Sequence, residues 1–399
     1  MRNIAPILMS LLFLAILVGA NIYLSRRVAW IFSLDSRTWL HILFAVLPVF
    51  MVGGMVGFSN STSLAGTILY GTAAIVTGLV LYLLLAFLVT DLLRLFVPLK
   101  PALFGVIAFS LAVGVTAYGL WNATRTQVTR LEVAVGEPQQ PGGEIRPGTR
   151  QETRIGNQSA DLPENRNTDP AETRNSTRIM HLSDIHLGHF RGKAFLSRLV
   201  ELTAAESPDL VVITGDLFDG RRQLHSETLE PLKQLDVPLF FVEGNHDGYT
   251  GVERVKALVR GAGVRVLENE VVDAGGLQLV GLNHMPADDG APSMHAGENK
   301  GTIRAVLDTL EIDPALPSVL LHHSPDGIEF AVKKGIGLYL AGHTHGGQLF
   351  PVNFINDLLF QFNRGLTNHN GTRIFVSKGA GTFGPPLRVG TRGEITLIE

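Results

Sequence analysis

The hydrophobic positions change their pattern near residue 125, and this change divides the chain into two parts. Before it, apolar residues form four long runs: Ile4–Leu24, Leu40–Phe58, Leu64–Thr90 and Pro101–Trp121. A helix that crosses a bilayer needs about 20 predominantly apolar residues. Helices at the surface of a soluble core carry a polar face, which these runs lack. The pattern therefore predicts an all-α membrane domain of about four transmembrane helices over residues 1–125.

Beyond residue 177, short apolar runs alternate with amphipathic segments, as is typical of a layered α/β domain. The predicted strands are Arg178–Leu182, Leu210–Thr214, Leu239–Val242, Ser318–Leu321 and Leu338–Ala341. The predicted helices include Ala194–Ala205 and Val252–Gly261. We therefore expect an α/β domain over residues 177–399.

The segment between the two domains, residues 136–176, is rich in Pro, Gly, Gln, Asn, Glu and Arg. Such a composition buries too little apolar surface to order itself, so the segment is predicted to be a disordered linker. Just before it, RLEVAV at residues 130–135 alternates like a short strand. If that strand is the first of the α/β domain, the polar segment is a surface insertion and not a domain boundary.

Composition and charge narrow the classes of function. The sequence has 46% hydrophobic and 17% charged residues, and its formal net charge is −3. A nucleic-acid-binding module would normally be basic, so none is expected. The chain has no cysteine, which excludes disulfides and thiolate zinc sites and leaves oxygen and imidazole nitrogen as metal ligands. The predicted spans hold no charge that suggests an ion path, which disfavours a transporter.

Basic residues that flank the predicted spans indicate an orientation in the membrane. The loops after the first and third spans share one side, and the segments before the first span and after the fourth share the other. The first side carries Arg26, Arg27, Arg37, Arg94 and Lys100, and the second carries Arg2, Arg125 and Arg130. Because cytoplasmic loops are enriched in Lys and Arg, this bias predicts a multi-pass cell-membrane protein whose α/β domain is extracytoplasmic.

Each predicted strand is followed at once by polar residues that can bind a metal. The motifs are SDIHLG, GDLFDG, GNHDG, HHSPD and GHTHGGQ, in this order. In open α/β sheets, ligands bind beyond the carboxyl ends of the strands, so one site fed by all five ends is expected. Successive side chains of a strand point to opposite faces. His322 and His323 therefore do not both serve that site, and alternation alone does not say which one does.

The number and type of these donors indicate two metal ions. Aspartate, asparagine and histidine from five strand ends are too many for one tetrahedral zinc. They suit two divalent ions about 3.5–4 Å apart that share a carboxylate and supply hydroxide near neutral pH. A shell of nitrogen and oxygen without sulfur suits Mn, Fe, Zn or Co, and the sequence does not choose among them.

The motifs DIH, GD, GNHD, a single His and GHTH occur in the order found in the calcineurin-like metallophosphoesterases, which the chain resembles over Arg130–Glu399. The stretches GHTHGGQLFP and KGAGTFGPPLRVG resemble the bacterial membrane-associated branch of that family. The resemblance implies an α/β fold, a four-layer αββα sandwich of two mixed sheets with the site at their edge. The all-α membrane domain would precede it.

The resemblance also assigns roles to single residues. Asp184, His186 and His345 would bind the first metal, Asp216 would bridge, and Asn245, His323 and His343 would bind the second. His323 is chosen over His322 because the ligand histidine of this branch stands two residues before a proline, here Pro325. His246 resembles the family's catalytic, non-ligand histidine, which contacts the phosphoryl group beside Asn245 and protonates the leaving oxygen.

The predicted function is that of a membrane-anchored, dinuclear metal-dependent phosphoesterase that uses a metal-bound hydroxide. A phosphodiester is favoured over a phosphomonoester, and a lipid-linked substrate is compatible with the resemblance, since the branch includes such enzymes. Arg388 is a candidate for a phosphate or head-group contact, with a structural ion pair as the alternative. The alternative function is a metal-binding membrane scaffold or sensor without turnover, although a scaffold needs no proton donor such as His246. The expected partners are the substrate and the bilayer, and the oligomeric state stays open.

Overall fold

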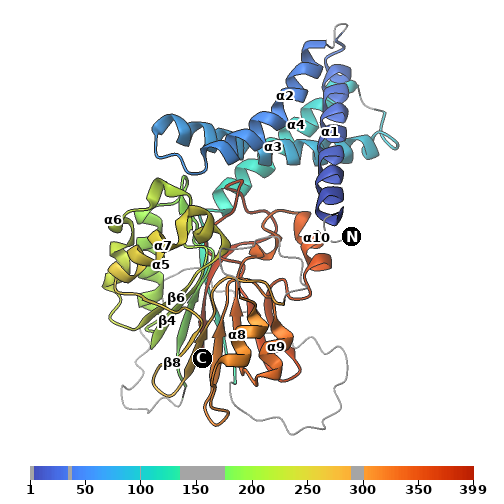
Figure 1. Ribbon diagram of the computed structural model, residues 1–399. Helices are drawn as coiled ribbons and strands as arrows, with labels where there is room; N and C mark the ends of the chain where they lie inside the picture. Colours follow the sequence, from blue (N-terminus) through green and yellow to red (C-terminus); the bar gives the residue numbers. More distant parts are fainter. Residues whose placement is uncertain (1–3, 35–37, 99, 135–175, 289–300) are drawn as a thin grey trace, which may run out of the picture. The chain divides into compact units, whose positions relative to one another are not determined.

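The computed structural model describes residues 4–34, 38–98, 100–134, 176–288 and 301–399 (Figure 1). The predicted linker at residues 136–176 lies outside these ranges except for its last residue. The chain forms two compact units, which are described separately. The helical unit comprises Met1–Asn122 and Gly384–Val389, and the α/β unit comprises Ala123–Phe383 and Gly390–Glu399.

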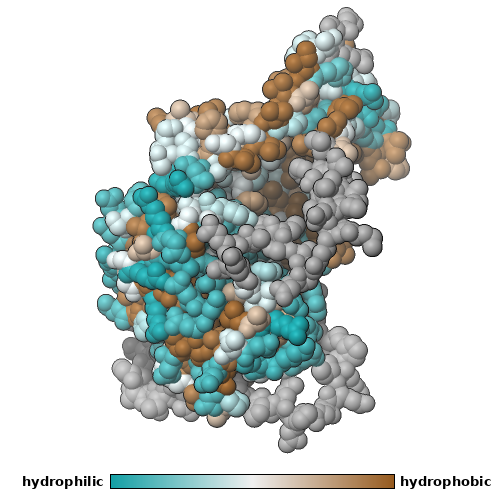
Figure 2. Space-filling model, viewed as in Figure 1, coloured by the Kyte–Doolittle hydropathy of each residue, from teal (hydrophilic) through white to brown (hydrophobic). Residues whose placement is uncertain are grey.

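The helical unit consists mainly of long apolar helices. They are α1 (Ile4–Ile31), α2 (Thr38–Phe58), α3 (Leu64–Leu93) and α4 (Pro101–Asn122). Of these, α2, α3 and α4 are long and apolar enough to cross a membrane. Although α1 covers the first predicted span, it is not one of them, so the described residues hold three candidate spans where about four were predicted. On the face shown in Figure 2, hydrophobic residues gather along α2, whereas the α/β unit is largely hydrophilic.

A small polar cluster joins the carboxyl ends of α1 and α3. Arg27 Nη2 lies 2.6 Å from Asp91 Oδ2, and the Tyr23 hydroxyl donates to the same oxygen at 2.6 Å. The Arg94 guanidinium lies over the Trp30 ring, 4.1 Å from its centroid. The cluster therefore holds the carboxyl ends of α1 and α3 together.

The segment Gly384–Val389 follows the second sheet in sequence and packs against α3 and α4. A Cβ on Gly78 would collide with the Leu387 side chain, and a Cβ on Gly119 would collide with the Val389 side chain. The Arg388 N–H donates to the carbonyl oxygen of Gly119 at 3.0 Å. Glycine at these two helix positions therefore lets the segment approach the helices closely.

The α/β unit contains two six-stranded sheets. The first has the order β1 (Thr126–Leu131), β14 (Gly393–Ile398), β2 (Ile179–Leu182), β4 (Leu210–Thr214), β6 (Leu239–Val242) and β7 (Arg265–Val266). The second has the order β12 (Gly365–His369), β13 (Thr372–Val376), β11 (Leu338–Ala341), β10 (Ser318–Leu321), β9 (Gln278–Gly281) and β8 (Glu270–Asp273). A separate short pair joins β3 (Leu187–Gly188) and β5 (Phe218–Asp219). Since β2, β4 and β6 are parallel, as are β9, β10 and β11, their carboxyl ends share one edge in each sheet.

The helices that pack on the outer faces of the sheets are α5 (Lys193–Ala205), α6 (Ser226–Leu229), α7 (Asn245–Gly261), α8 (Ile303–Thr309) and α9 (Ile328–Lys333). A further helix, α10 (Val352–Leu359), follows the loop after β11. Single 3₁₀ turns cover Arg221–Gln223, Glu230–Gln234 and His345–Gly347.

Alternation along the strands builds three apolar layers. In β4, Ile213 faces a core shared with α5 and α7, and its neighbour Val212 faces the core between the two sheets. In β10, Leu321 faces that same inner core, and Leu320 faces a third core under α8 and α9. The helices therefore lie on opposite outer faces of the paired sheets (Figure 1). The predicted αββα sandwich is confirmed.

The third motif begins a helix, where the sequence predicted a loop. α7 starts at Asn245, seven residues before the predicted Val252. Its Asp247 carboxylate accepts a hydrogen bond of 2.9 Å from the Gly244 N–H. A carboxylate in the first turn satisfies free N–H groups and favours the helix there. Gly251, with φ 117°, then interrupts the helix near the predicted start.

Candidate metal centre

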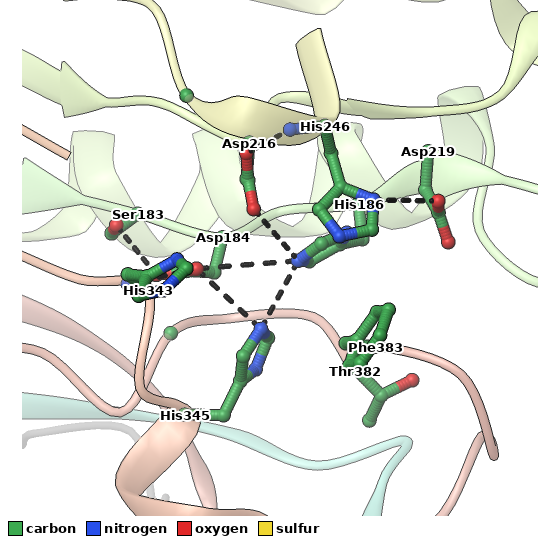
Figure 3. Close-up of polar contacts among 12 residues, drawn as sticks. Ser183, Asp184, His186, Asp216, Asp219, His246, His343, His345, Thr382 and Phe383 are labelled. Atoms are coloured by element: carbon green, nitrogen blue, oxygen red, sulfur yellow. Dashed lines mark hydrogen bonds and ion pairs between the residues drawn. The ribbon is translucent and has the colours of Figure 1, made fainter. Parts of the chain in front are cut away.

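The loops that follow β2, β4, β6, β10 and β11 meet at one place. They bring the motif residues together at the carboxyl ends of the parallel strands. Figure 3 shows those from the loops after β2, β4, β6 and β11. Three groups of residues could each hold a metal ion, because within each group the ligand atoms lie within 4.8 Å of one another. The groups are Asp184, His186 and His345; Asp216, His323 and His343; and His186, Asp219 and His246. Every residue that the sequence assigned to metal binding is therefore in or beside this cluster.

The backbone at the cluster adopts a conformation that residues other than glycine rarely take. The φ angles are 51° at Asp184, 51° at His186, 51° at Asp216, 71° at His343 and 51° at His345. Positive φ in a non-glycine residue costs of order 1–3 kcal/mol, and such strain concentrates at functional sites. Five of the proposed ligands thus hold their side chains by local backbone strain that the surrounding fold must offset.

Glycines next to the ligands allow the loops to approach one another. A Cβ on Gly244 would collide with the Asp216 carboxylate, and one on Gly342 would collide with Ser183 and with the Asp184 carboxylate. Any larger residue at either position would push a carboxylate out of place. This steric requirement explains why the motifs GNHD and GHTH each begin with glycine.

The first ligand group contains one carboxylate and two imidazoles. His186 Nε2 lies 3.1 Å from His345 Nε2 and 4.0 Å from Asp184 Oδ1. His345 Nε2 lies 3.5 Å from the same Asp184 oxygen. Two nitrogens bound to one tetrahedral metal at about 2.0–2.1 Å would lie roughly 3.4 Å apart. The spacing of these three atoms therefore fits ligands of a single ion.

The second group surrounds His323. Its Nε2 lies 3.2 Å from Asp216 Oδ2, 3.1 Å from Asn245 Oδ1 and 3.2 Å from His343 Nδ1. Its Nδ1 lies 2.9 Å from the Thr214 carbonyl oxygen, which only accepts hydrogen bonds, so Nδ1–H is the donor. Although burial opposes it, Asp216 raises the pKa of His323 to about 10, so without a metal Nε2 carries a proton that faces these acceptors. A divalent cation bound by these atoms would take the place of that proton, and the residues fit a metal.

Asp216 connects the two groups. Its Oδ2 lies 3.6 Å from His186 Nε2 and 3.2 Å from His323 Nε2. Although burial opposes it, the neighbouring His323 holds the pKa of Asp216 well below its ordinary value. Burial raises the pKa of Asp184 to about 6 and lowers the pKa of His186 to about 4. A buried carboxylate beside neutral imidazoles is the donor chemistry that a divalent cation stabilises.

His246 stands beside the ligands but pairs with a different carboxylate. Its Nδ1 lies 3.0 Å from Asp219 Oδ1, and its backbone N–H donates to Asp216 Oδ1 at 2.8 Å. Burial alone would lower the pKa of His246, but Asp216 and Asp219 outweigh burial and raise it to about 9. In the absence of metal the ring is therefore a cation at neutral pH. The rings of Tyr249 and Phe383 pack around it at centroid distances of 5.5 and 5.0 Å.

His322 points away from the ligands. Its Nδ1 lies 2.8 Å from the Ser324 carbonyl oxygen and 3.2 Å from the Tyr339 hydroxyl. It also stacks on His284, with ring centroids 5.8 Å apart and an interplanar angle of 11°. The two histidines after β10 thus leave the strand on opposite sides, with His323 turned to the cluster.

One residue at the site does not follow from the sequence motifs. The His284 ring centroid lies 5.7 Å from that of His323 and 6.4 Å from that of His343. Burial lowers its pKa to about 2. It follows β9, which runs parallel to β10 and ends at the same edge. Had β9 been predicted, its strand end would have pointed to His284.

Two further polar residues, Asp247 and Arg388, are not among the ligands. The Asp247 carboxylate accepts from the backbone N–H groups of Phe218 at 3.0 Å and Gly244 at 2.9 Å, and so orders the second and third loops. Arg388 is fully buried within the helical unit and is not in the ligand cluster. Its suggested contact with substrate stays a prediction.

Comparison with known proteins agrees with this geometry. A family model described as calcineurin-like phosphoesterase matches residues 177–347. An uncharacterized metallophosphoesterase of Aquifex aeolicus is 34% identical over 229 residues, which cover 55% of this chain and 84% of that protein. One of Helicobacter pylori is 34% identical over 229 residues, 56% of this chain and 59% of that protein. A transmembrane protein with metallophosphoesterase domain from Danio rerio is 33% identical over 247 residues, 57% of this chain and 54% of that protein.

A two-sheet α/β domain with aspartates and histidines clustered at its strand ends is typical of metal-dependent hydrolases. Within that class, the chain belongs to the calcineurin-like metallophosphoesterase family. It spans somewhat more than half the length of the Helicobacter pylori and Danio rerio relatives.

Metal content tests the cluster directly. We expect the purified full chain, loaded with manganese and desalted, to retain about two ions, as measured by elemental analysis. Asp216→Asn should lose both, because a neutral amide does not bridge two cations. The matched control is Asp219→Asn, the same change on the carboxylate that pairs with His246, which should keep both. A reproducible value of one ion or fewer in the unaltered chain would contradict the two-metal site.

The histidine pair after β10 gives a second test. His323→Ala should reduce metal content and nearly abolish activity, because it removes a nitrogen donor. His322→Ala should leave metal content unchanged and lower the free energy of unfolding by about 1–3 kcal/mol, since the Ser324 carbonyl and Tyr339 hydroxyl lose a buried partner. Elemental analysis and thermal unfolding distinguish the two. The reverse result would place His322 in the site.

Proposed function

We propose that the protein is a membrane-anchored, metal-dependent phosphoester hydrolase that holds two divalent ions. The observation that carries this proposal is the position of the Asp216 carboxylate, whose Oδ2 is 3.6 Å from His186 Nε2 and 3.2 Å from His323 Nε2. An oxygen shared between two ligand groups is what a bridging carboxylate requires. Membership of the metallophosphoesterase family supports the reaction class.

The ligands divide between two ions in this proposal. Asp184, His186 and His345 hold one ion, Asn245, His323 and His343 hold the other, and Asp216 is shared. When bound, the two ions polarise the phosphoryl group, activate water and neutralise charge on the attacking and leaving oxygens. Oxygen and imidazole donors suit Mn, Fe, Zn or Co, and we leave the metal unassigned.

His246 supplies the proton in this mechanism. Asp219 accepts from its Nδ1, which fixes the ring and leaves Nε2 to face the substrate. The two neighbouring carboxylates favour the imidazolium form that a general acid needs before it protonates the leaving oxygen. Asn245 stands at the start of α7 beside His246 and contributes its side-chain oxygen to the second ligand group.

The surroundings of His246 favour a substrate with an organic leaving group. Tyr249 is 55% exposed and Phe383 is 51% exposed, and both rings contact the His246 ring. Exposed aromatic rings beside the proton donor give an apolar surface for the group that leaves. We therefore favour a phosphodiester over a phosphomonoester and propose a lipid-linked substrate, because the same chain carries candidate membrane spans.

The second candidate is a metal-binding membrane scaffold or sensor without turnover. The family name alone does not exclude it, but the Asp219–His246 pair has no purpose in a scaffold. Hydrolysis of a chromogenic phosphodiester by the manganese-loaded chain discriminates between the two. If the protein is a scaffold, the unaltered chain should hydrolyse this substrate no faster than the Asp216→Asn variant does.

Substitution of His246 separates binding from chemistry. His246→Ala should keep both metals and lower turnover by roughly 10²–10⁴, the usual contribution of a general acid. The loss should be smaller for substrates with good leaving groups, because these need less protonation. Elemental analysis and steady-state rates with two chromogenic esters of different leaving group make the measurement. Equal losses for both esters would remove the proposed role.

The orientation of the protein is the remaining part of the proposal. From the Lys and Arg bias we propose that the α/β unit lies outside the cytoplasm. The natural chain has no cysteine, so Leu316→Cys, at a position that is 42% exposed, adds a unique label site. A membrane-impermeant maleimide should label this variant in intact spheroplasts. Labelling that appears only after lysis would reverse the orientation.

A further inference from the structure

The short helix α10 exposes an apolar face. Its exposed residues are Phe354 at 57%, Ile355 at 51%, Leu358 at 86% and Leu359 at 70%. Residues of the first pair stand three to four residues before their counterparts in the second, so the four lie along one side of the helix. Single exposed apolar residues are normal, but four together on an eight-residue helix mark an interaction surface.

The opposite face of α10 is bonded to the loop that carries two proposed metal ligands. Asn356 Nδ2 donates to the Thr344 carbonyl oxygen at 3.3 Å, between His343 and His345. Asn353 is buried and lies so close to Gly347 that a Cβ there would collide with its backbone. The polar face of α10 is therefore fixed to the metal loop, which leaves the apolar face for another partner.

The charges on α10 are already compensated. Asp357 Oδ2 pairs with Arg364 Nη2 at 2.8 Å, and Arg364 Nη1 donates to the Gly346 carbonyl oxygen at 3.1 Å. An uncompensated carboxylate would be repelled by anionic lipids, which give membranes a negative surface potential. Asp357 is thus no obstacle to a lipid surface.

The chain itself supplies a reason why that partner is a bilayer. The Gln348 side chain donates to the Phe383 carbonyl oxygen at 2.9 Å and accepts from the Phe383 N–H at 2.8 Å. The backbone carbonyl oxygen of Gln348 accepts from Thr391 Oγ1 at 3.0 Å. Phe383 and Thr391 flank Gly384–Val389, which belongs to the unit that holds the membrane helices. α10 begins four residues after Gln348, a separation of at most about 14 Å along the chain.

We propose that α10 is a membrane-interface helix. Its residues Phe354, Ile355, Leu358 and Leu359 enter the boundary between lipid head groups and acyl chains. Its polar face meanwhile holds the loop of His343 and His345. The metal loop is thereby positioned at a lipid surface. This inference stands on the exposure and contacts of α10 and does not rest on the proposed hydrolysis.

A single fluorescent probe tests the proposal on the full chain. Because the chain has no cysteine, Leu358→Cys labelled with an environment-sensitive dye reports only on α10. The matched control is Leu316→Cys, also an exposed leucine, which precedes β10 at the end opposite the metal loops. Both labelled proteins are reconstituted into phosphatidylcholine vesicles with and without lipids that carry a nitroxide on the acyl chain.

The probe at Leu358 should lose most of its fluorescence with nitroxide lipids and resist quenching by iodide in water. The probe at Leu316 should show the opposite. A probe at Leu358 that iodide quenches freely would overturn the proposal. A blue-shifted probe that nitroxide lipids do not quench would also overturn it, because the helix would then be covered by protein, either the helical unit or a second chain. Leu359→Cys repeats the measurement if Leu358→Cys does not fold.

Discussion

The structure depends on one electrostatic constraint, the convergence of electron-pair acceptors around Asp216. The Thr214 carbonyl accepts a hydrogen bond from His323 Nδ1, so the ring turns Nε2 toward Asp216 and Asn245. Although burial opposes it, Asp216 raises the pKa of His323, so without a metal a single proton on Nε2 is the donor that these acceptors share. A divalent cation would replace that proton and would contact several of the acceptors at once, which is why the arrangement suits a metal.

The scaffold offsets the cost of this arrangement. Left-handed backbone at Asp184, Asp216 and His343 costs of order 1–3 kcal/mol each. Parallel strands on both sides of a continuous inner core carry that cost, because β4 and β10 are fully buried and bring their loops to the same edge. Rigid strands and strained turns thus hold side chains at distances that flexible loops would not maintain.

The sequence predicts more of this site than of its surroundings, for physical reasons. Strands buried on both faces appear as short apolar runs, so β4, β6, β10 and β11 have the predicted bounds. The donors after them follow from strand polarity alone. Alternation separates His322 from His323 but does not say which faces inward, because that depends on packing against Tyr339 and His284. β9 was not predicted because QLVG is short and has no clear apolar or alternating pattern. His284, which follows β9, was therefore not recognised as part of the site.

α10 and Gly384–Val389 were not predictable, since their character lies in what they contact. VNFINDLL has too few residues to suggest a membrane element by length. Only the structure separates its apolar face from the asparagine that bonds to the Thr344 carbonyl. Likewise, the role of Gly78 and Gly119 follows only from the positions of Leu387 and Val389 against them. Gln348, four residues before α10, exchanges hydrogen bonds with the backbone of Phe383, and the exposed Phe383 ring contacts His246. Under the proposed function, a leaving group that extends from His246 would therefore meet an apolar side chain first.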